Sequence, residues 1–226
     1  MAEEQMIVIE CAKCGSKSEY VVFDVLNSQV DYFEKQELIN DKLFECKCEN
    51  CGMVSGLLYE LVYHDVEMNT MVYLVDEDHV EGVYTGLALA DRAFEKAGMP
   101  RIHNRIVTCQ HRFREKAIIL DRGLDDRVIE IMKVYCAEEA NESLGNTINL
   151  DEAETFFCVV DGVPRFEIYC GEKTIFAEIP DGLYDHVKLQ FSELLADDPD
   201  IIVDEEWALG ILEEEEYDDG DDDLPF

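Results

Sequence analysis

The first third of the chain alternates short apolar runs with polar turns. Runs of this length that are rich in Val, Ile and Tyr are typical of strands. A more polar stretch at residues 31–41 predicts a short helix among them. The apolar runs that we expect to form strands are residues 6–11, 19–26, 43–48, 56–65 and 68–75.

The middle of the chain changes to helical periodicity, with apolar residues three or four positions apart. The predicted helices span residues 85–98, 111–120 and 125–136. Their expected buried positions are Phe113, Ala117 and Leu120 in the second helix, and Val128, Ile129, Met132 and Cys136 in the third. Thr85 is a candidate N-cap and Gly98 a candidate end of the first helix, and Asp125 or Asp126 suits the N-cap of the third. Residues 105–110 are a candidate strand.

The last third of the chain predicts a second β-containing region followed by a loss of order. Residues 155–180 have the pattern of a three-stranded antiparallel meander, with a first turn at the Asp-Gly pair 161–162. Pro164 indicates an edge strand or a late strand start. Residues 183–195 predict a closing helix, and a disordered acidic tail is expected from about Glu213.

Two C-x-x-C-G motifs carry the strongest chemical signal, one at residues 11–15 and one at 48–52. Zinc prefers four tetrahedral ligands and binds thiolates well, and each motif delivers two sulfurs from one turn whose glycine tolerates a positive φ. We therefore expect one structural zinc ion, with four thiolates and no catalytic water, held by Cys11, Cys14, Cys48 and Cys51. The alternative is a set of unmetallated core or redox cysteines. Cys46 is either a bystander or an alternative ligand.

These elements together predict an α+β fold with a zinc-ribbon-like β module, a helical segment and a small antiparallel β meander before the disordered acidic tail. A polar stretch around residues 137–147 is the expected boundary in the second half. The expected divisions are 1–83 for the zinc-ribbon-like domain, 84–142 for the helical segment, 143–212 for the meander with its closing helix, and 213–226 for the tail.

The charge balance narrows the classes of partner. The chain has 53 acidic and 18 basic residues, a net charge of −35, which repels nucleic acid phosphates and anionic membranes and favours basic partners. Residues 92–133 are the exception, with ten basic residues against six acids. Direct nucleic acid or membrane binding is therefore not expected.

Cysteine content and the first residues bear on localisation. Nine cysteines, an odd number, favour reduced thiols and metal ligation over disulfides. The first ten residues lack the basic region of a signal peptide, and no apolar stretch is long enough to span a membrane. We expect a cytoplasmic protein.

A catalytic site is the weaker interpretation of the charged residues in 112–130. That stretch and His64 or His111 are candidates for an enzyme of unknown reaction, but helix capping and local ion pairing explain the same charges. No phosphate-binding loop, dinucleotide fingerprint, serine hydrolase motif or zinc protease motif occurs. The sequence favours a non-enzymatic protein and leaves an enzyme open.

The two cysteine pairs resemble those of the bacterial and archaeal CpXC family, in which each pair usually has the form C-P-x-C. Ala12 and Glu49 stand here at the usual proline positions, and the ligand spacing is unchanged. Residues 57–65 and 105–133 are also similar to segments of that family, so the resemblance covers about residues 6–133. It implies a metal-binding domain and no defined biochemical role.

The last six residues resemble the C-terminal tip of bacterial single-stranded DNA-binding proteins, which recruits replication and repair enzymes. They are Asp221, Asp222, Asp223, Leu224, Pro225 and Phe226. In such a peptide a terminal Phe fills an apolar pocket while the acidic run steers toward a basic rim. The sequence therefore predicts a zinc-binding adaptor that docks on basic pockets of DNA-replication or repair proteins. The alternatives are a solubilising tail and a tail that covers residues 92–133 of its own chain.

Overall fold

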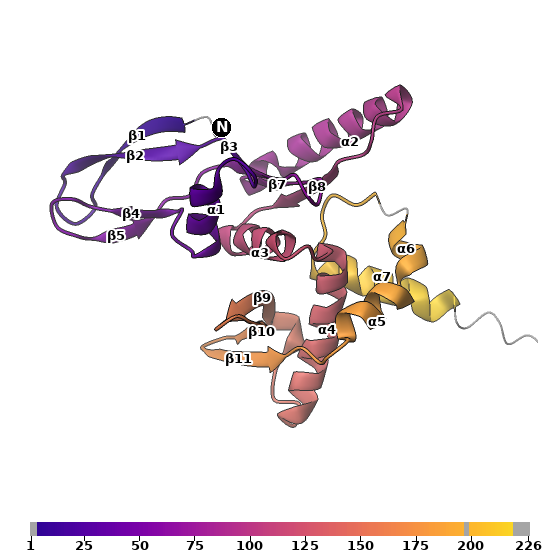
Figure 1. The fold of residues 1–226 in the computed structure, drawn as a ribbon. Coiled ribbons are helices and arrows are strands. Elements are labelled where there is room, and N and C mark those ends of the chain that lie inside the picture. Colours follow the sequence, from indigo (N-terminus) through magenta and orange to yellow (C-terminus); the bar gives the residue numbers. More distant parts are fainter. Residues whose placement is uncertain (1–3, 197–198, 219–226) are drawn as a thin grey trace, which may run out of the picture. The chain divides into compact units, whose positions relative to one another are not determined.

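The computed structural model describes residues 4–196 and 199–218. The chain divides into two compact units, Met1–Asp121 and Arg122–Phe226, and each is described by itself. Both units combine helices with small sheets, so the fold is α+β, as the sequence predicts (Figure 1). The division after Asp121 separates the second and third predicted helices.

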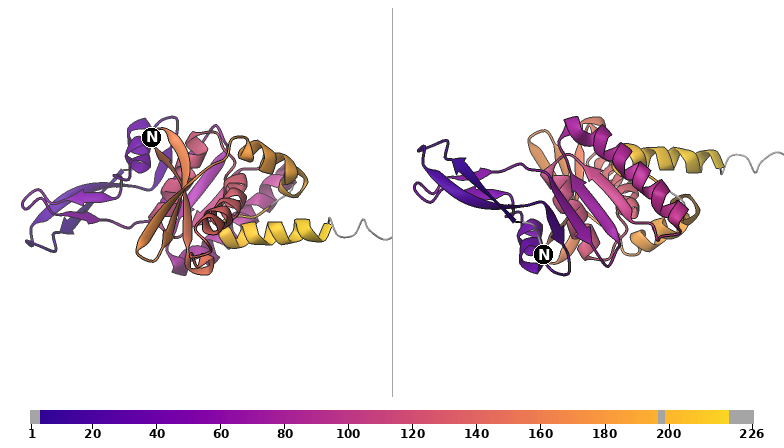
Figure 2. Two further views of the ribbon diagram at one scale, coloured as in Figure 1. Left: turned by 90° about the horizontal axis from the view of Figure 1, so that it is seen from below. Right: turned by 90° about the horizontal axis from the view of Figure 1, so that it is seen from above.

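Two short antiparallel ribbons form the first part of the first unit. Strands β1 (Glu4–Glu10) and β2 (Lys17–Phe23) make one ribbon, and β4 (Glu45–Lys47) and β5 (Val54–Gly56) make the other. A cysteine turn joins the two strands of each ribbon. Figure 2 shows the two ribbons running together away from the four-stranded sheet of the same unit.

A four-stranded mixed sheet forms the body of the first unit, in the order β3-β6-β7-β8. Its strands are β3 (Val25–Asn27), β6 (Leu61–Asp65), β7 (Thr70–Leu74) and β8 (His103–Val107). The antiparallel β6–β7 pair corresponds to the two adjacent strands expected from the sequence. The outer strands β3 and β8 both join it in parallel, which the apolar pattern alone did not predict.

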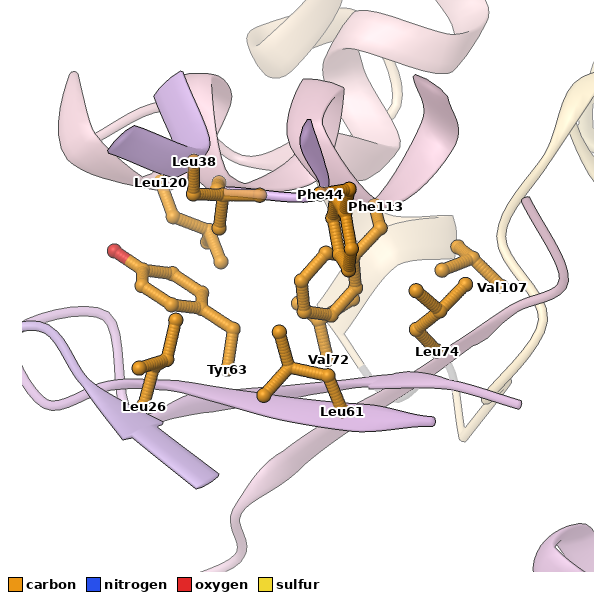
Figure 3. Close-up of a cluster of buried hydrophobic side chains, with 11 residues drawn as sticks. Leu26, Leu38, Phe44, Leu61, Tyr63, Val72, Leu74, Val107, Phe113 and Leu120 are labelled. Atoms are coloured by element: carbon orange, nitrogen blue, oxygen red, sulfur yellow. The ribbon is translucent and has the colours of Figure 1, made fainter. Parts of the chain in front are cut away.

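Helices α1 (Tyr32–Ile39) and α3 (Gln110–Asp121) pack on one face of this sheet and enclose the core. Phe113 and Ala117 are completely buried, and Leu120 is nearly so, which confirms the predicted face of α3. Figure 3 shows the side chains of Phe113 and Leu120 meeting those of the sheet. The buried cluster comprises Leu26, Leu38, Phe44, Leu61, Tyr63, Val72, Leu74, Val107, Phe113, Ala117 and Leu120.

Helix α2 (Val80–Ala97) lies on the side of the sheet that carries Asn104, whose amide donates to Asp91 at 3.2 Å. The helix follows a 3₁₀ turn at Glu77–His79, so it begins earlier than predicted. Thr85 therefore lies inside the helix, and its assignment as N-cap was wrong. Gly98 ends the helix with a φ of 67°, as predicted, because glycine enters the left-handed region without strain.

The second unit packs a three-stranded sheet against helix α4 (Asp126–Ser143). The sheet is the predicted meander of β9 (Glu154–Val160), β10 (Val163–Cys170) and β11 (Lys173–Glu178), in the order β11-β10-β9. Pro164 pairs with Val159 of β9, and β11 joins only from Arg165, so the proline precedes the three-stranded part. Asp125 caps α4, as predicted, by accepting from the Arg127 N–H at 3.0 Å.

Four further elements belong to the described residues of the second unit. They are a 3₁₀ turn at Leu150–Glu152, α5 (Leu183–Gln190), α6 (Ser192–Ala196) and α7 (Glu205–Asp218). Helix α7 continues five residues beyond Glu213, although the sequence predicts that order ends there. Glutamate has good helix propensity, and Glu215 also accepts from Gln190 of α5 at 2.7 Å, which explains the longer helix. None of the described helices is long and apolar enough to cross a membrane.

Phe113→Ala should destabilise the first unit by about 3–5 kcal/mol, because it leaves a cavity in the buried cluster. The matched control is Phe33→Ala, since Phe33 is 70% exposed on α1 and its loss should cost less than about 1 kcal/mol. Denaturant unfolding followed by circular dichroism measures both. Equal losses in the two variants would contradict this description of the core.

Candidate metal centre

The two cysteine turns have the same backbone geometry. In the first, the N–H of Cys11 donates to the carbonyl of Ser16 at 2.9 Å, and in the second, that of Cys48 donates to Met53 at 2.8 Å. Each turn ends in a glycine, with φ of 71° and 70°, whose N–H donates back to the first cysteine. Only glycine adopts this backbone freely, and it allows each turn to fold back tightly. Each tight turn then holds its two cysteine side chains on the same side.

The four predicted ligands come together at the meeting point of these turns. The sulfurs of Cys11, Cys14, Cys48 and Cys51 all lie within 4.8 Å of one another. Cys11 and Cys51 are 3.6 Å apart, and Cys14 and Cys48 are 3.7 Å apart, measured between sulfurs. Four thiolates bound tetrahedrally at about 2.3 Å from a metal ion would be roughly 3.8 Å apart. The arrangement therefore has the dimensions of a four-sulfur metal site.

Ser16 and Asn50 support the sulfurs from outside the cluster, and the cysteine spacing alone predicts neither of them. The Ser16 hydroxyl lies 3.1 Å from the sulfurs of Cys14 and Cys48, and the Asn50 amide donates to Cys14 at 3.5 Å. These residues immediately follow or lie within the cysteine turns. That position is the signal that points to them, because outer-shell donors commonly come from the turn itself.

The hydrogen bonds favour the thiolate form at two of the four sulfurs. Hydrogen bonds with the side chain and backbone of Ser16, and a further one from Asn50, lower the pKa of Cys14 to about 5. Ser16 is also the main cause of the lowered pKa of Cys48. Thiolate is the form that binds metal, so the turns prepare both residues as ligands.

Cys51 differs from these two cysteines, because its pKa is raised. A backbone hydrogen bond with Met53 lowers its pKa, but desolvation and the three neighbouring sulfurs outweigh this and raise it to about 12. Both desolvation and hydrogen bonding to the neighbouring sulfurs favour the neutral thiol over the thiolate. A bound cation reverses this preference, because its charge deprotonates a coordinating thiol.

Cys46 lies outside the four-sulfur group of the described residues. It is on β4 opposite Ser55, it is 95% buried, and burial raises its pKa. A thiol held in its neutral form in an apolar environment behaves as a small hydrophobic side chain. Of the two roles left open by the sequence, the geometry favours the bystander.

The second cysteine turn is attached directly to the core of the first unit. The Phe44 ring packs against those of Tyr59 and Phe113, with centroids 5.2 and 6.2 Å apart. The Phe44 carbonyl accepts from Leu57, whose own carbonyl accepts from the Gln110 side chain of α3, both at 2.8 Å. Strand β4 therefore holds the site at a defined place on the sheet.

Several charged residues of 112–130 have contacts that suit a structural role. The Arg114 guanidinium donates to the Ile39 carbonyl at 2.8 Å in the first unit. In the second unit Arg127 pairs with Asp125 at 2.7 Å, and Glu130 pairs with Lys133 at 2.9 Å. These contacts favour the capping and ion-pairing interpretation.

The remaining candidate residues are on separate elements or outside the described chain. His64 is half-buried on β6, and His111 is exposed on α3. The six tail residues 221–226 lie outside the described residues.

Comparison with known proteins gives one match. The model of the CpXC protein family matches residues 9–133, more than half of the chain, and that range contains all four clustered cysteines. No curated protein and no solved structure matches the chain.

Ser16→Ala should weaken metal binding about tenfold, because it removes the hydroxyl that contacts two sulfurs and keeps the backbone bond to Cys11. Titration with Co²⁺, followed by its thiolate absorption, measures the affinity. Ser55→Ala, at an exposed serine on β5, is the matched control and should bind as the unchanged protein does. If Ser16→Ala also binds unchanged, Ser16 does not support the cluster.

Proposed function

The chain belongs to the CpXC family, and we propose that its paired cysteines hold one structural zinc ion in a non-enzymatic cytoplasmic adaptor. The observation that carries the zinc assignment is the convergence of four sulfurs within 4.8 Å. An all-thiolate tetrahedral set from two C-x-x-C turns suits zinc, whereas hard cations prefer oxygen ligands. Four protein ligands leave no open coordination position, which favours a structural role.

The ion would connect ribbons that have little core of their own. Met6 and Val8 of β1 and Val54 of β5 are each more than half exposed. Isolated two-stranded ribbons are marginally stable in water. Zinc bonds between the ribbons would replace the missing apolar contacts, as in other small metal-dependent modules.

The purified protein should contain about one zinc per chain, since one four-sulfur cluster occurs in the described residues. Cys48→Ser should lose the metal, because it removes one of the four sulfurs. Cys46→Ser is the matched control, two residues away and equally buried, and should retain it. Elemental analysis of the three proteins measures the content. Iron in place of zinc, or equal metal in both variants, would refute the assignment.

The adaptor role rests on the resemblance of residues 221–226 to the tip of bacterial single-stranded DNA-binding proteins. We propose that this peptide docks on basic pockets of DNA-replication or repair proteins. Leu224 and Phe226 supply apolar side chains for a pocket, and Pro225 limits the backbone freedom lost on binding. The preceding aspartates add attraction to a basic rim.

The charge distribution supports a basic partner for this peptide. The stretch from Glu193 onward contains sixteen acidic residues and no basic one, so 16 of the 35 net negative charges lie there. Helix α7 carries several of them as far as Asp218. Such a field accelerates encounter with a positively charged surface, and salt weakens it.

The double change Leu224→Ala and Phe226→Ala should reduce binding to purified tip-binding repair proteins by at least about tenfold, because it removes the apolar anchors. Fluorescence anisotropy of the labelled full chain measures the affinity, with the tip peptide of a single-stranded DNA-binding protein as competitor. Leu209→Ala, at a half-exposed leucine of α7, is the matched control.

Binding that the double change leaves intact would refute the docking proposal. The zinc content of the same samples separates this failure from a failure of the metal site. If increased salt exposes the tail of the unchanged chain to protease without any partner, the tail instead lies on its own basic segment, residues 92–133.

A further inference from the structure

A groove follows the outer edge of the sheet in the second unit. Two cavities of about 590 and 440 Å³ lie end to end there and share Leu144 and Ile175 in their walls. One wall is the C-terminal part of α4 and the turn that follows it, and the other is β11 with its flanking residues. The groove thus runs along the whole of β11.

Strand β11 has one strand neighbour among the described residues. It pairs with β10 on one side, and it is the outer strand of the sheet (Figure 1). Consecutive residues Ile175–Glu178 line the first cavity, so the second side of the strand faces the groove. An edge strand presents a row of backbone N–H and C=O groups that another extended chain can pair with.

The groove walls are apolar at their centre. Cys136 and Ala140 of α4 face Ile175 and Ala177 of β11 across the first cavity. Leu144 and Phe176 are 47% and 49% exposed, although both are large apolar side chains. Side chains of a bound strand would cover Leu144 on the α4 side of β11 and Phe176 on its other face, and the apolar surface would gain free energy by leaving water.

The rim of the groove is acidic. Glu139, Glu178 and Asp181 line the first cavity, and Glu152 lines the second, against the single cation Lys173. The charge excludes the chain's own acidic tail as occupant, because it would place like charges together. It also disfavours a second copy, which would bring a net charge of −35 to the same edge.

We propose that this groove binds an extended segment of a partner protein by strand addition to β11. Its backbone pairs with the β11 edge, and alternate apolar side chains enter the space between α4 and the strand. Lysine or arginine residues on the segment pair with the carboxylates of the rim. The site involves neither the four sulfurs nor residues 221–226, so it is independent of the proposed function.

A fluorescent peptide of about nine alternating valines and lysines, long enough to follow the edge, tests the proposal. Anisotropy with the full-length protein should show saturable binding that salt weakens. A peptide alternating valine and aspartate should not bind, because the rim repels it. A version N-methylated on alternate residues, which loses backbone donors and keeps charge and side chains, should also fail.

Leu144→Arg should weaken the peptide at least about tenfold, because it places a bulky cation at the point that both cavities share. Leu189→Arg makes the same change at a residue that is 75% exposed on α5, and it should have no effect. Glu178→Lys should weaken binding about threefold to tenfold through charge. Its control is Glu154→Lys, on the opposite edge strand β9.

Several outcomes would overturn the proposal. Absence of saturable binding, or equal loss in each variant and its control, excludes a specific groove. Equal binding of the methylated peptide reduces the interaction to charge alone and excludes strand addition. A dimer in sedimentation experiments that Leu144→Arg dissociates, together with no peptide binding, would show that a second copy occupies the edge.

Discussion

The meeting of four sulfurs between two turns is the constraint on which the first unit depends. Strands β1 and β2 expose Met6, Val8 and Val21 to solvent, so the ribbon has few apolar contacts with which to hold itself in place. Its cysteine turn is connected to the second turn through sulfur atoms 3.6 and 3.7 Å apart. Without a cation these sulfurs compete for protons, and the raised pKa of Cys51 is the result. The geometry of the cluster therefore suits a bound cation, whose charge would favour the thiolate form of all four cysteines.

Phe44 connects the cysteine cluster to the core of the first unit. It lies just before β4 and packs against Phe113, while its backbone connects through Leu57 to Gln110 of the same helix. A change in the second cysteine turn therefore acts on the core through one strand, whereas the first turn reaches it through β2 and β3. Each turn supplies two sulfurs to the cluster, but the two turns are joined to the core by different strands.

The sequence predicted the features that depend on local spacing. The C-x-x-C-G turns, the buried face of α3, the Gly98 and Asp125 ends and the Asp161-Gly162 turn each need only a few adjacent residues. The parallel pairing of β3 with β6 depends on a distant strand, and no short pattern encodes it. The role of Ser16 depends on the approach of Cys48, which is 32 residues away. Thr85 was misassigned because the preceding 3₁₀ turn already starts the helix.

Acidic residues act differently on α7 and at the β11 edge of the second unit. On α7 and beyond, the charges follow one another along the chain, so they create a general attraction for basic surfaces with little geometric preference. At the β11 edge, carboxylates such as Glu139 and Glu178 surround apolar walls and a row of backbone groups, so charge there is combined with shape. A basic partner attracted by the charges of α7 would still need an extended segment with alternating side chains to occupy the groove at the β11 edge. Selectivity for such a segment would therefore come from the strand edge and its apolar walls, and the acidic helix would govern the rate of encounter.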